Sequence, residues 1–253
     1  MASPKPTTVV IAPGAWQRPS GFSSFAAQLR HAGHATEVVA YPSVGGTATP
    51  LPGLADDVAA TRAVLTKLLD SGGEAEVLLL CHSYGGVVGS CAVEGFSVVE
   101  RERAGRKGGV RLVVYMAAFM IPKGSSLLQM LGGQPLPWMD VQGDKTTAVA
   151  SLLPQVAFND LPAEQAEQYA QDVTHSSSVV FATPSTFDPW AHGIRCAYIF
   201  CTEDRALPYP NQQQMAAQLG AEPVTWTLKA GHCPFLSVPE QLLEVVLEAA
   251  EVR

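Results

Sequence analysis

Residues 76–89 constrain the fold of this chain more than any other segment. An apolar run at residues 77–80 is typical of a buried strand, and a run of small residues with helical character follows Gly85. Between them stands Cys-His-Ser-Tyr-Gly, residues 81–85, a near match to the pattern Gly-x-Ser-x-Gly. That pattern makes a sharp, crowded strand-to-helix turn that presents its serine at the top of a sheet. The segment therefore predicts an α/β architecture with Ser83 as a candidate nucleophile.

Strand-like and helix-like segments alternate along the chain. Apolar or β-branched runs predict further strands at residues 7–12, 34–40, 110–118, 195–201 and 223–228. Helical spacing predicts helices at residues 20–33, 54–70, 162–173, 210–219 and 239–252, and one after Ser83 that runs to about residue 101. This alternation favours a mainly parallel sheet with helices on both faces, in which ligands bind at the carboxyl ends of the strands.

Residues 123–190 differ in character from the rest of the chain. They lack long apolar strands and mix Leu, Met and Trp with many Pro, Gly and Ser. We interpret them as an insertion that covers the sheet and divides one α/β core into residues 1–122 and residues 191–253. The 253 residues, 47% of them hydrophobic, are enough to bury a substantial core.

The amino-acid composition makes some binding partners and some cellular compartments less plausible than others. The net charge of −7 argues against nucleic acid and anionic membranes as partners, so the charge run at residues 100–109 is interpreted as solvated surface. The five cysteines show no CxxC pair and no metal-ligand spacing, which favours reduced, mostly buried thiols. We expect neither a metal nor another cofactor. The first apolar run, residues 9–12, is too short for a signal peptide or a membrane span. We expect a cytoplasmic protein.

A serine hydroxyl is a weak nucleophile, so it needs a base within hydrogen-bond reach and an acid that orients the base. His232 lies between the last predicted strand and the last predicted helix, where the base of such a site belongs. His82 adjoins Ser83, but we expect its side chain to point into packing. Solvent-exposed structural roles suit His31 and His34, which precede Ser83, and His175 and His192 lie in or at the edge of the insertion.

The preferred acid is Asp204, which follows the penultimate strand and precedes His232. Glu203 is its neighbour and rival, whereas Asp188 at the end of the insertion has the character of a turn residue. The predicted strand that ends at residue 118 carries no carboxylate, which removes the other common location for the acid.

Acyl transfer also needs N–H donors aimed at the oxygen that becomes an anion. The N–H of Tyr84 is one candidate, and the loop after the first strand supplies Ala15, where the adjacent Gly14 permits close approach. An ordinary turn is the alternative interpretation of that loop. Candidate substrate-binding residues, each of which also suits an ordinary core position, are Trp16, Phe119, Met120 and Trp138.

Five segments together resemble a known superfamily. They are Ala-Pro-Gly-Ala-Trp at residues 12–16, Cys-His-Ser-Tyr-Gly-Gly at 81–86, Tyr-Met-Ala-Ala-Phe-Met at 115–120, Cys-Thr-Glu-Asp at 201–204 and Ala-Gly-His at 230–232. The chain resembles the α/β-hydrolase superfamily, within it the branch of plant methylesterases, hydroxynitrile lyases and similar fungal and bacterial hydrolases. The resemblance implies the α/β-hydrolase fold and a cap at residues 123–190 that forms the pocket. It also implies site residues: the triad Ser83, Asp204 and His232, and the oxyanion donors Ala15 and Tyr84.

Three positions depart from the family pattern. Pro13 replaces a histidine in the oxyanion loop, and Cys81 replaces the first glycine of the serine motif. Cys233 follows the candidate base where the lyases have a lysine, which argues against lyase activity.

The expected function is that of a cofactor-free serine hydrolase, a carboxylesterase or lactonase. It would cleave an ester or lactone of a small, fairly apolar molecule through an acyl-enzyme. The same site suits two alternatives within biosynthesis, namely C–C bond chemistry and macrolactone closure. A non-catalytic ligand-binding protein on this fold is the alternative from a different class. The sequence leaves the substrate and the oligomeric state open, with a homodimer among the options.

Overall fold

The computed structural model describes residues 7–71 and 74–252. Its main sheet has six parallel strands in the order β2-β1-β3-β4-β8-β9. They are β1 (Thr8–Ala12), β2 (Thr36–Val38), β3 (Glu76–His82), β4 (Gly109–Met116), β8 (Cys196–Cys201) and β9 (Val224–Leu228). The parallel sheet expected from the sequence is confirmed.

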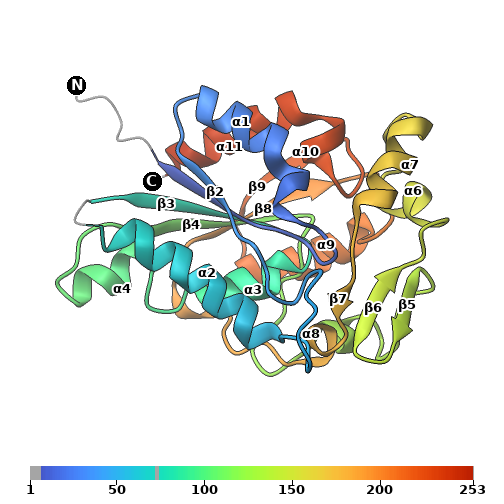
Figure 1. The fold of residues 1–253 in the computed structure, drawn as a ribbon. Helices are drawn as coiled ribbons and strands as arrows, with labels where there is room; N and C mark the ends of the chain where they lie inside the picture. The colour runs from blue at the N-terminus through green and yellow to red at the C-terminus, as the bar shows by residue number, and fades with distance from the viewer. Residues whose placement is uncertain (1–6, 72–73, 253) are drawn as a thin grey trace.

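Helices cover both faces of this sheet (Figure 1). One face carries α1 (Ser23–His31), α10 (Pro234–Ser237) and α11 (Pro239–Glu251). The other face carries α2 (Leu54–Leu69), α3 (Gly85–Ala92), α4 (Val98–Arg103) and α9 (Tyr209–Ala216). Three short 3-10 helices, η1 (Pro19–Phe22), η2 (Pro189–His192) and η3 (Ala217–Leu219), lie in connections between these elements of the described chain.

The sheet separates two hydrophobic cores, because successive side chains of a strand point to opposite faces. In β3, Val77 and Leu79 belong to the core beneath α2 and α3. Leu78 and Leu80 belong to the core beneath α1 and α11. All four side chains are buried, which explains why β3 reads as a continuous apolar run and not as an alternating one.

The insertion, residues 123–190, lies between β4 and β8 and carries a small antiparallel sheet of its own, in the order β5-β6-β7. Its strands are β5 (Met139–Gln142), β6 (Lys145–Ala148) and β7 (Ser176–Ser177). Its helices are α5 (Leu127–Met130), α6 (Leu153–Val156), α7 (Ala163–Asp172) and α8 (Val179–Ala182). The helix expected at residues 162–173 is α7. Figure 1 shows the insertion beside the carboxyl ends of the main strands, so it is placed to cover a site there.

The helix after Ser83 is shorter than the sequence predicts. It ends at Ala92, and the chain turns at Gly95, whose φ of 81° is left-handed. Ser97 then caps the separate helix α4, since its Oγ accepts a hydrogen bond from the N–H of Glu100. A left-handed residue interrupts a helix, so the prediction of one helix to residue 101 is wrong.

Within the described part of the chain, every helix falls short of the length and apolar character needed to cross a bilayer.

Candidate active site

Ser83 stands on the turn between β3 and α3 in a strained backbone conformation. Its φ is 52°, a left-handed value that residues other than glycine rarely adopt. The turn is held from both sides, because the Ser83 carbonyl accepts hydrogen bonds from the N–H groups of Gly86 and Phe119. Strain of this kind persists where the surrounding structure enforces it, and it concentrates at functional sites.

Glycines let the turn pack against its neighbours. A Cβ at Gly85 would lie 2.1 Å from the carbonyl oxygen of Ala12. A Cβ at Gly89 would lie 2.3 Å from Sγ of Cys81. Cys81, which stands where the family pattern has glycine, is therefore accommodated by the missing side chain at Gly89.

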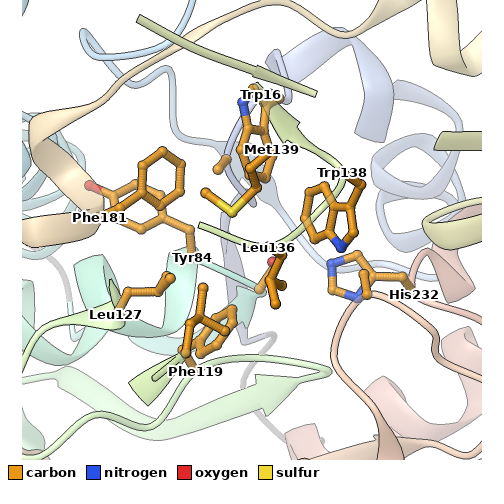
Figure 2. Close-up of a pocket in the computed structure, with 13 residues that line it drawn as sticks. Trp16, Tyr84, Phe119, Leu127, Leu136, Trp138, Met139, Phe181 and His232 are labelled. Carbon is orange, nitrogen blue, oxygen red and sulfur yellow. The ribbon is translucent and has the colours of Figure 1, made fainter. Parts of the chain in front are cut away.

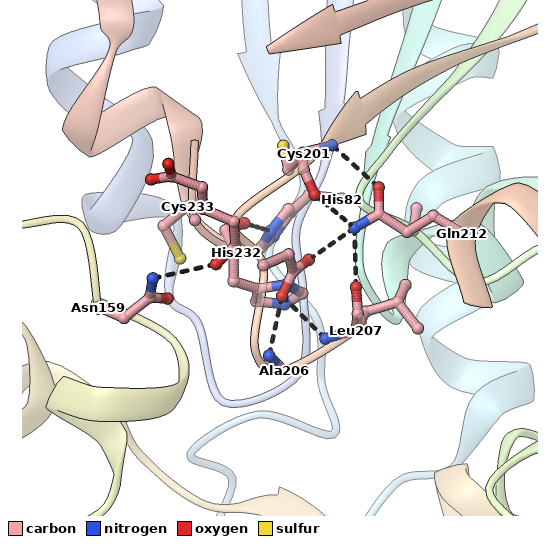
Figure 3. A network of polar contacts seen from close by, with 12 residues as sticks. His82, Asn159, Cys201, Ala206, Leu207, Gln212, His232 and Cys233 are labelled. Atoms are coloured by element: carbon pink, nitrogen blue, oxygen red, sulfur yellow. Dashed lines mark hydrogen bonds and ion pairs between the residues drawn. The ribbon is translucent and has the colours of Figure 1, made fainter. Parts of the chain in front are cut away.

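The candidate base and acid meet on the loops that follow the last two main strands. His232 Nδ1 lies 2.8 Å from Asp204 Oδ2, and both side chains are buried. Asp204 Oδ1 also accepts hydrogen bonds from the N–H groups of Ala206 and Leu207, each at 2.8 Å. Its Oδ2 accepts a hydrogen bond from Nε2 of Gln212 at 3.1 Å (Figure 3). These donors fix the carboxylate against the imidazole.

Gln212, in α9, connects the acid to the end of β8. Its side chain is fully buried, and Nε2 also donates to the carbonyl oxygens of Cys201 and Leu207. Its Oε1 accepts the N–H of Cys201 at 2.9 Å. The sequence prediction missed Gln212, because nothing in a run of three glutamines indicates which one faces inward.

The two rival carboxylates lie elsewhere. Glu203 is well exposed and pairs with Lys229 at 3.7 Å. Asp188 pairs with His192 at 3.2 Å and accepts the N–H of Lys123. Of the three candidate acids, Asp204 is the one that contacts His232.

His82 is buried beside His232 and supports its loop. Its Nε2 lies 2.8 Å from the carbonyl oxygen of His232, and the two ring centroids are 4.7 Å apart. Burial is the main cause that lowers the pKa of His82 well below its ordinary value, and the nearby His232 adds to it. The ring is therefore neutral at pH 7, and its second nitrogen, Nδ1, lies 3.0 Å from Oε1 of Gln17.

A mainly apolar cavity, shown in Figure 2, has Ser83 among its lining residues. The core supplies Ala15, Trp16, Ser83, Tyr84, Phe119, Ala206 and His232, and the insertion supplies Leu127, Leu131, Leu136, Trp138, Met139 and Phe181. Trp16 stacks on Phe181 at 5.2 Å and meets Trp138 edge-on at 5.4 Å between ring centroids. Among the described residues that line this cavity, none is Asp, Glu, Lys or Arg.

A second cavity adjoins the first and shares Ser83 and His232 with it. Its further walls include Ala148, Leu153, Ala157, Phe158 and Val173 of the insertion. Ser83 thus has apolar space on two sides.

The candidate pocket residues have different positions. Trp16, Phe119 and Trp138 line the first cavity, whereas Met120 is fully buried in the core and lines neither cavity. The sequence prediction missed most of the insertion's contribution, including Leu127, Leu136, Met139 and Phe181. Their one signal was a set of large apolar side chains in an otherwise polar, proline-rich and glycine-rich segment.

The chain belongs to the alpha/beta hydrolase family, whose model matches residues 9–245. It is 28% identical over 247 residues to Alpha/beta hydrolase nvfD of Aspergillus novofumigatus, covering 96% of both chains. It is 27% identical over 246 residues to Methylesterase 7 of Arabidopsis thaliana, covering 89% of each. The resemblance to the branch that contains plant methylesterases is therefore confirmed.

Solved structures share the fold. Polyneuridine aldehyde esterase superposes with a TM-score of 0.78 at 19% identity, over 98% of this chain and all of that one. A pyrethroid hydrolase from Sphingobium faniae superposes with a TM-score of 0.77 at 23% identity, over 98% of each chain. The family match and the esterase-type relatives support a hydrolase function for this chain.

Proposed function

We propose that this chain is a serine hydrolase that cleaves an ester or lactone of a small apolar molecule through a covalent acyl-enzyme. One observation carries the proposal. Ser83, on a strained turn, and His232, hydrogen-bonded to Asp204, both line the same cavity.

Acylation begins when Ser83 Oγ attacks the carbonyl carbon of the substrate and His232 Nε2 takes its proton. Asp204 accepts the Nδ1 hydrogen of the imidazole, which keeps Nε2 available as the base and stabilises the imidazolium that forms. When the tetrahedral intermediate collapses, His232 returns the proton to the leaving oxygen. An ester then releases an alcohol, and a lactone opens to a hydroxyacyl-enzyme.

The oxyanion of the tetrahedral intermediate is held by the N–H groups of Ala15 and Tyr84. Both residues line the cavity beside Ser83. The backbone hydrogen bonds of the described residues use neither N–H, so both donors are available to a substrate oxygen. Deacylation repeats the sequence with water as the nucleophile and His232 as its base.

The residues that line the two cavities support the proposal that the substrate is apolar. Aromatic and aliphatic side chains surround Ser83, and the described residues that line the first cavity include no Asp, Glu, Lys or Arg to bind an ionised substrate. Apolar space on both sides of the serine suits a molecule with an apolar group on each side of its scissile carbonyl.

Turnover of p-nitrophenyl acetate and butyrate by the wild type and by Ser83→Ala tests the proposal. Removing a triad serine lowers kcat by about 10⁴-fold or more. Ser24→Ala, which removes an exposed hydroxyl from α1, is the matched control and should keep the wild-type rate. A Ser83→Ala protein that keeps the wild-type rate would contradict the proposal.

A further inference from the structure

The oxyanion loop holds three successive peptide N–H groups in different ways. The N–H of Gly14 donates to Oε1 of Gln17 at 3.0 Å, and the N–H of Trp16 donates to Oγ of Ser176 at 2.8 Å. Between them, the N–H of Ala15 has no acceptor among the described residues. Peptide units are planar and joined at Cα atoms, so anchoring the two flanking units orients the middle one. The side chains of Gln17 and Ser176 therefore bind the two flanking N–H groups, and the N–H of Ala15 stays available to a ligand.

The anchor on Trp16 comes from the insertion. Ser176 belongs to β7, and its side chain is fully buried. Two further residues of the insertion also bind Trp16. The indole Nε1 donates a hydrogen bond to the carbonyl oxygen of Thr146, in β6, at 2.7 Å. The carbonyl oxygen of Trp16 accepts a hydrogen bond from the N–H of Thr174, which precedes β7, at 3.1 Å. The polar groups of Trp16 are thus all directed at residues of the insertion.

Trp16 needs such an anchor because of its backbone conformation. Its φ is 64°, a left-handed value that is unfavourable for a residue with a large side chain. A conformation of this kind persists only when contacts around it enforce it. The hydrogen bonds to Ser176, Thr146 and Thr174 are those contacts.

Ser176 is itself held rigidly. It pairs with Thr146 in the small sheet and forms a bridge with Val44 of the core loop after β2. The next residue, Ser177, donates its N–H to the carbonyl oxygen of Ser43 at 2.9 Å. The hydroxyl of Ser176 is therefore fixed relative to both the insertion and the core.

We propose that Ser176 is a positioning residue, whose hydroxyl fixes the Trp16 peptide and thereby aims the Ala15 N–H at the substrate oxyanion. This inference rests on the proposed function, since an oxyanion forms only if Ser83 attacks an acyl group. Its consequence is that the oxyanion site is complete only while the insertion is seated on the core.

The test is Ser176→Ala, assayed with p-nitrophenyl butyrate and with a trifluoromethyl ketone of matching chain length as a transition-state analogue. Misaiming one oxyanion donor should lower kcat by about 10-fold to 100-fold, with KM changed less than about twofold. The inhibition constant of the trifluoromethyl ketone should rise by about the same factor, because its hemiketal anion uses the same donors.

Two further variants separate positioning from general structural damage. Ser177→Ala removes the neighbouring hydroxyl, which has no hydrogen bond among the described residues, and should match the wild type. Ser176→Cys keeps a weak acceptor at the γ position, so its kcat should fall between those of the wild type and Ser176→Ala. A Ser176→Ala protein with kcat and inhibition constant within twofold of wild type would overturn the inference, as would an equal loss in Ser177→Ala.

Hydrogen exchange of the Trp16 amide gives a readout that needs no turnover. The amide should exchange slowly in the wild type and faster in Ser176→Ala, with Ser177→Ala unchanged. Equal exchange in the wild type and Ser176→Ala would overturn the anchor. A wild type with no turnover of any ester would instead contradict the proposed function, so the two failures are distinguishable.

Discussion

The phenol of Tyr84 donates a hydrogen bond to Asp57, with 2.8 Å between Oη and Oδ2. Asp57 belongs to α2 and is fully buried. Its carboxylate also accepts the N–H of Ser43 at 3.0 Å and the hydroxyl of Ser43 at 2.6 Å. The residue after the candidate nucleophile is therefore tied to a helix and to the core loop that pairs with β7.

This buried carboxylate predicts a pH dependence of stability. Burial is the main cause that raises the pKa of Asp57 above its ordinary value of 3.8, against the opposing effect of the hydrogen bonds from Ser43 and Tyr84. The folded state then holds the proton more tightly than the unfolded state. The stability that this brings is fully present below pH 3.8 and is lost as pH rises through the raised pKa.

Comparing the wild type with Asp57→Asn isolates this contribution, since asparagine does not titrate. The free energy of unfolding of the wild type minus that of Asp57→Asn should decrease as pH rises from 3.8 towards neutrality. Urea unfolding at stepped pH measures it. A difference that stays constant or increases with pH would show that Asp57 does not titrate with a raised pKa.

Gln212 should matter to both stability and activity. Gln212→Leu leaves the N–H of Cys201 and the carbonyl oxygen of Leu207 without their partners, at a cost of about 2–4 kcal/mol in unfolding free energy. The same change removes a donor from Asp204, so kcat should fall by about tenfold. Gln213→Leu alters an exposed neighbour on the same helix and should change neither quantity. Equal effects of the two substitutions would contradict the role assigned to Gln212.

The turn at Ser83 should not tolerate a side chain at Gly85. A Cβ there would lie 2.1 Å from one backbone carbonyl oxygen and 2.5 Å from the next, so Gly85→Ala should cost about 3 kcal/mol or more, or prevent folding. Gly21→Ala is the matched control, because a Cβ at Gly21 meets nothing within 4 Å. Thermal unfolding of the two variants checks the contrast, and a Gly85→Ala protein as stable as Gly21→Ala would refute it.

Phe181 should set the size of group that the first cavity accepts. Phe181→Ala removes a ring that stacks on Trp16. The ratio of kcat/KM for p-nitrophenyl octanoate to that for acetate should rise by about tenfold, because added methylenes then find apolar space. The ratio is independent of the fraction folded. Val179→Ala, an exposed change on the same short helix, should leave the ratio unchanged. A ratio that is unchanged in Phe181→Ala would show that the acyl group of the substrate does not bind beside Phe181.

The fold could be predicted from the sequence because its signals are local. The apolar run of β3, the small residues after Ser83 and the alternation of strands and helices each lie within one stretch of chain. The chain order of a serine, an acid and a histidine at strand ends indicated His232 and favoured Asp204 over its neighbour Glu203, and the structure brings Asp204 and His232 to 2.8 Å.

The supporting residues could not be predicted, because their roles come from contacts between distant segments. Ser176 is the first of three consecutive serines, and only the pairing of β7 with β6 decides which hydroxyl reaches Trp16. The strands of the insertion escaped prediction for a similar reason. They are short and polar, and pairing with one another and with the core loop stabilises them more than their own apolar character does.

Labelling with a fluorophosphonate probe, followed by peptide mass spectrometry, tests the central claim most directly. Such probes phosphonylate only an activated serine, so the wild type should carry a single adduct at Ser83, and Ser83→Ala should carry none. His232→Ala should label far more slowly, because the base is gone. A wild-type protein that does not label, or an adduct that maps to another residue, would contradict the assignment of Ser83 as the nucleophile.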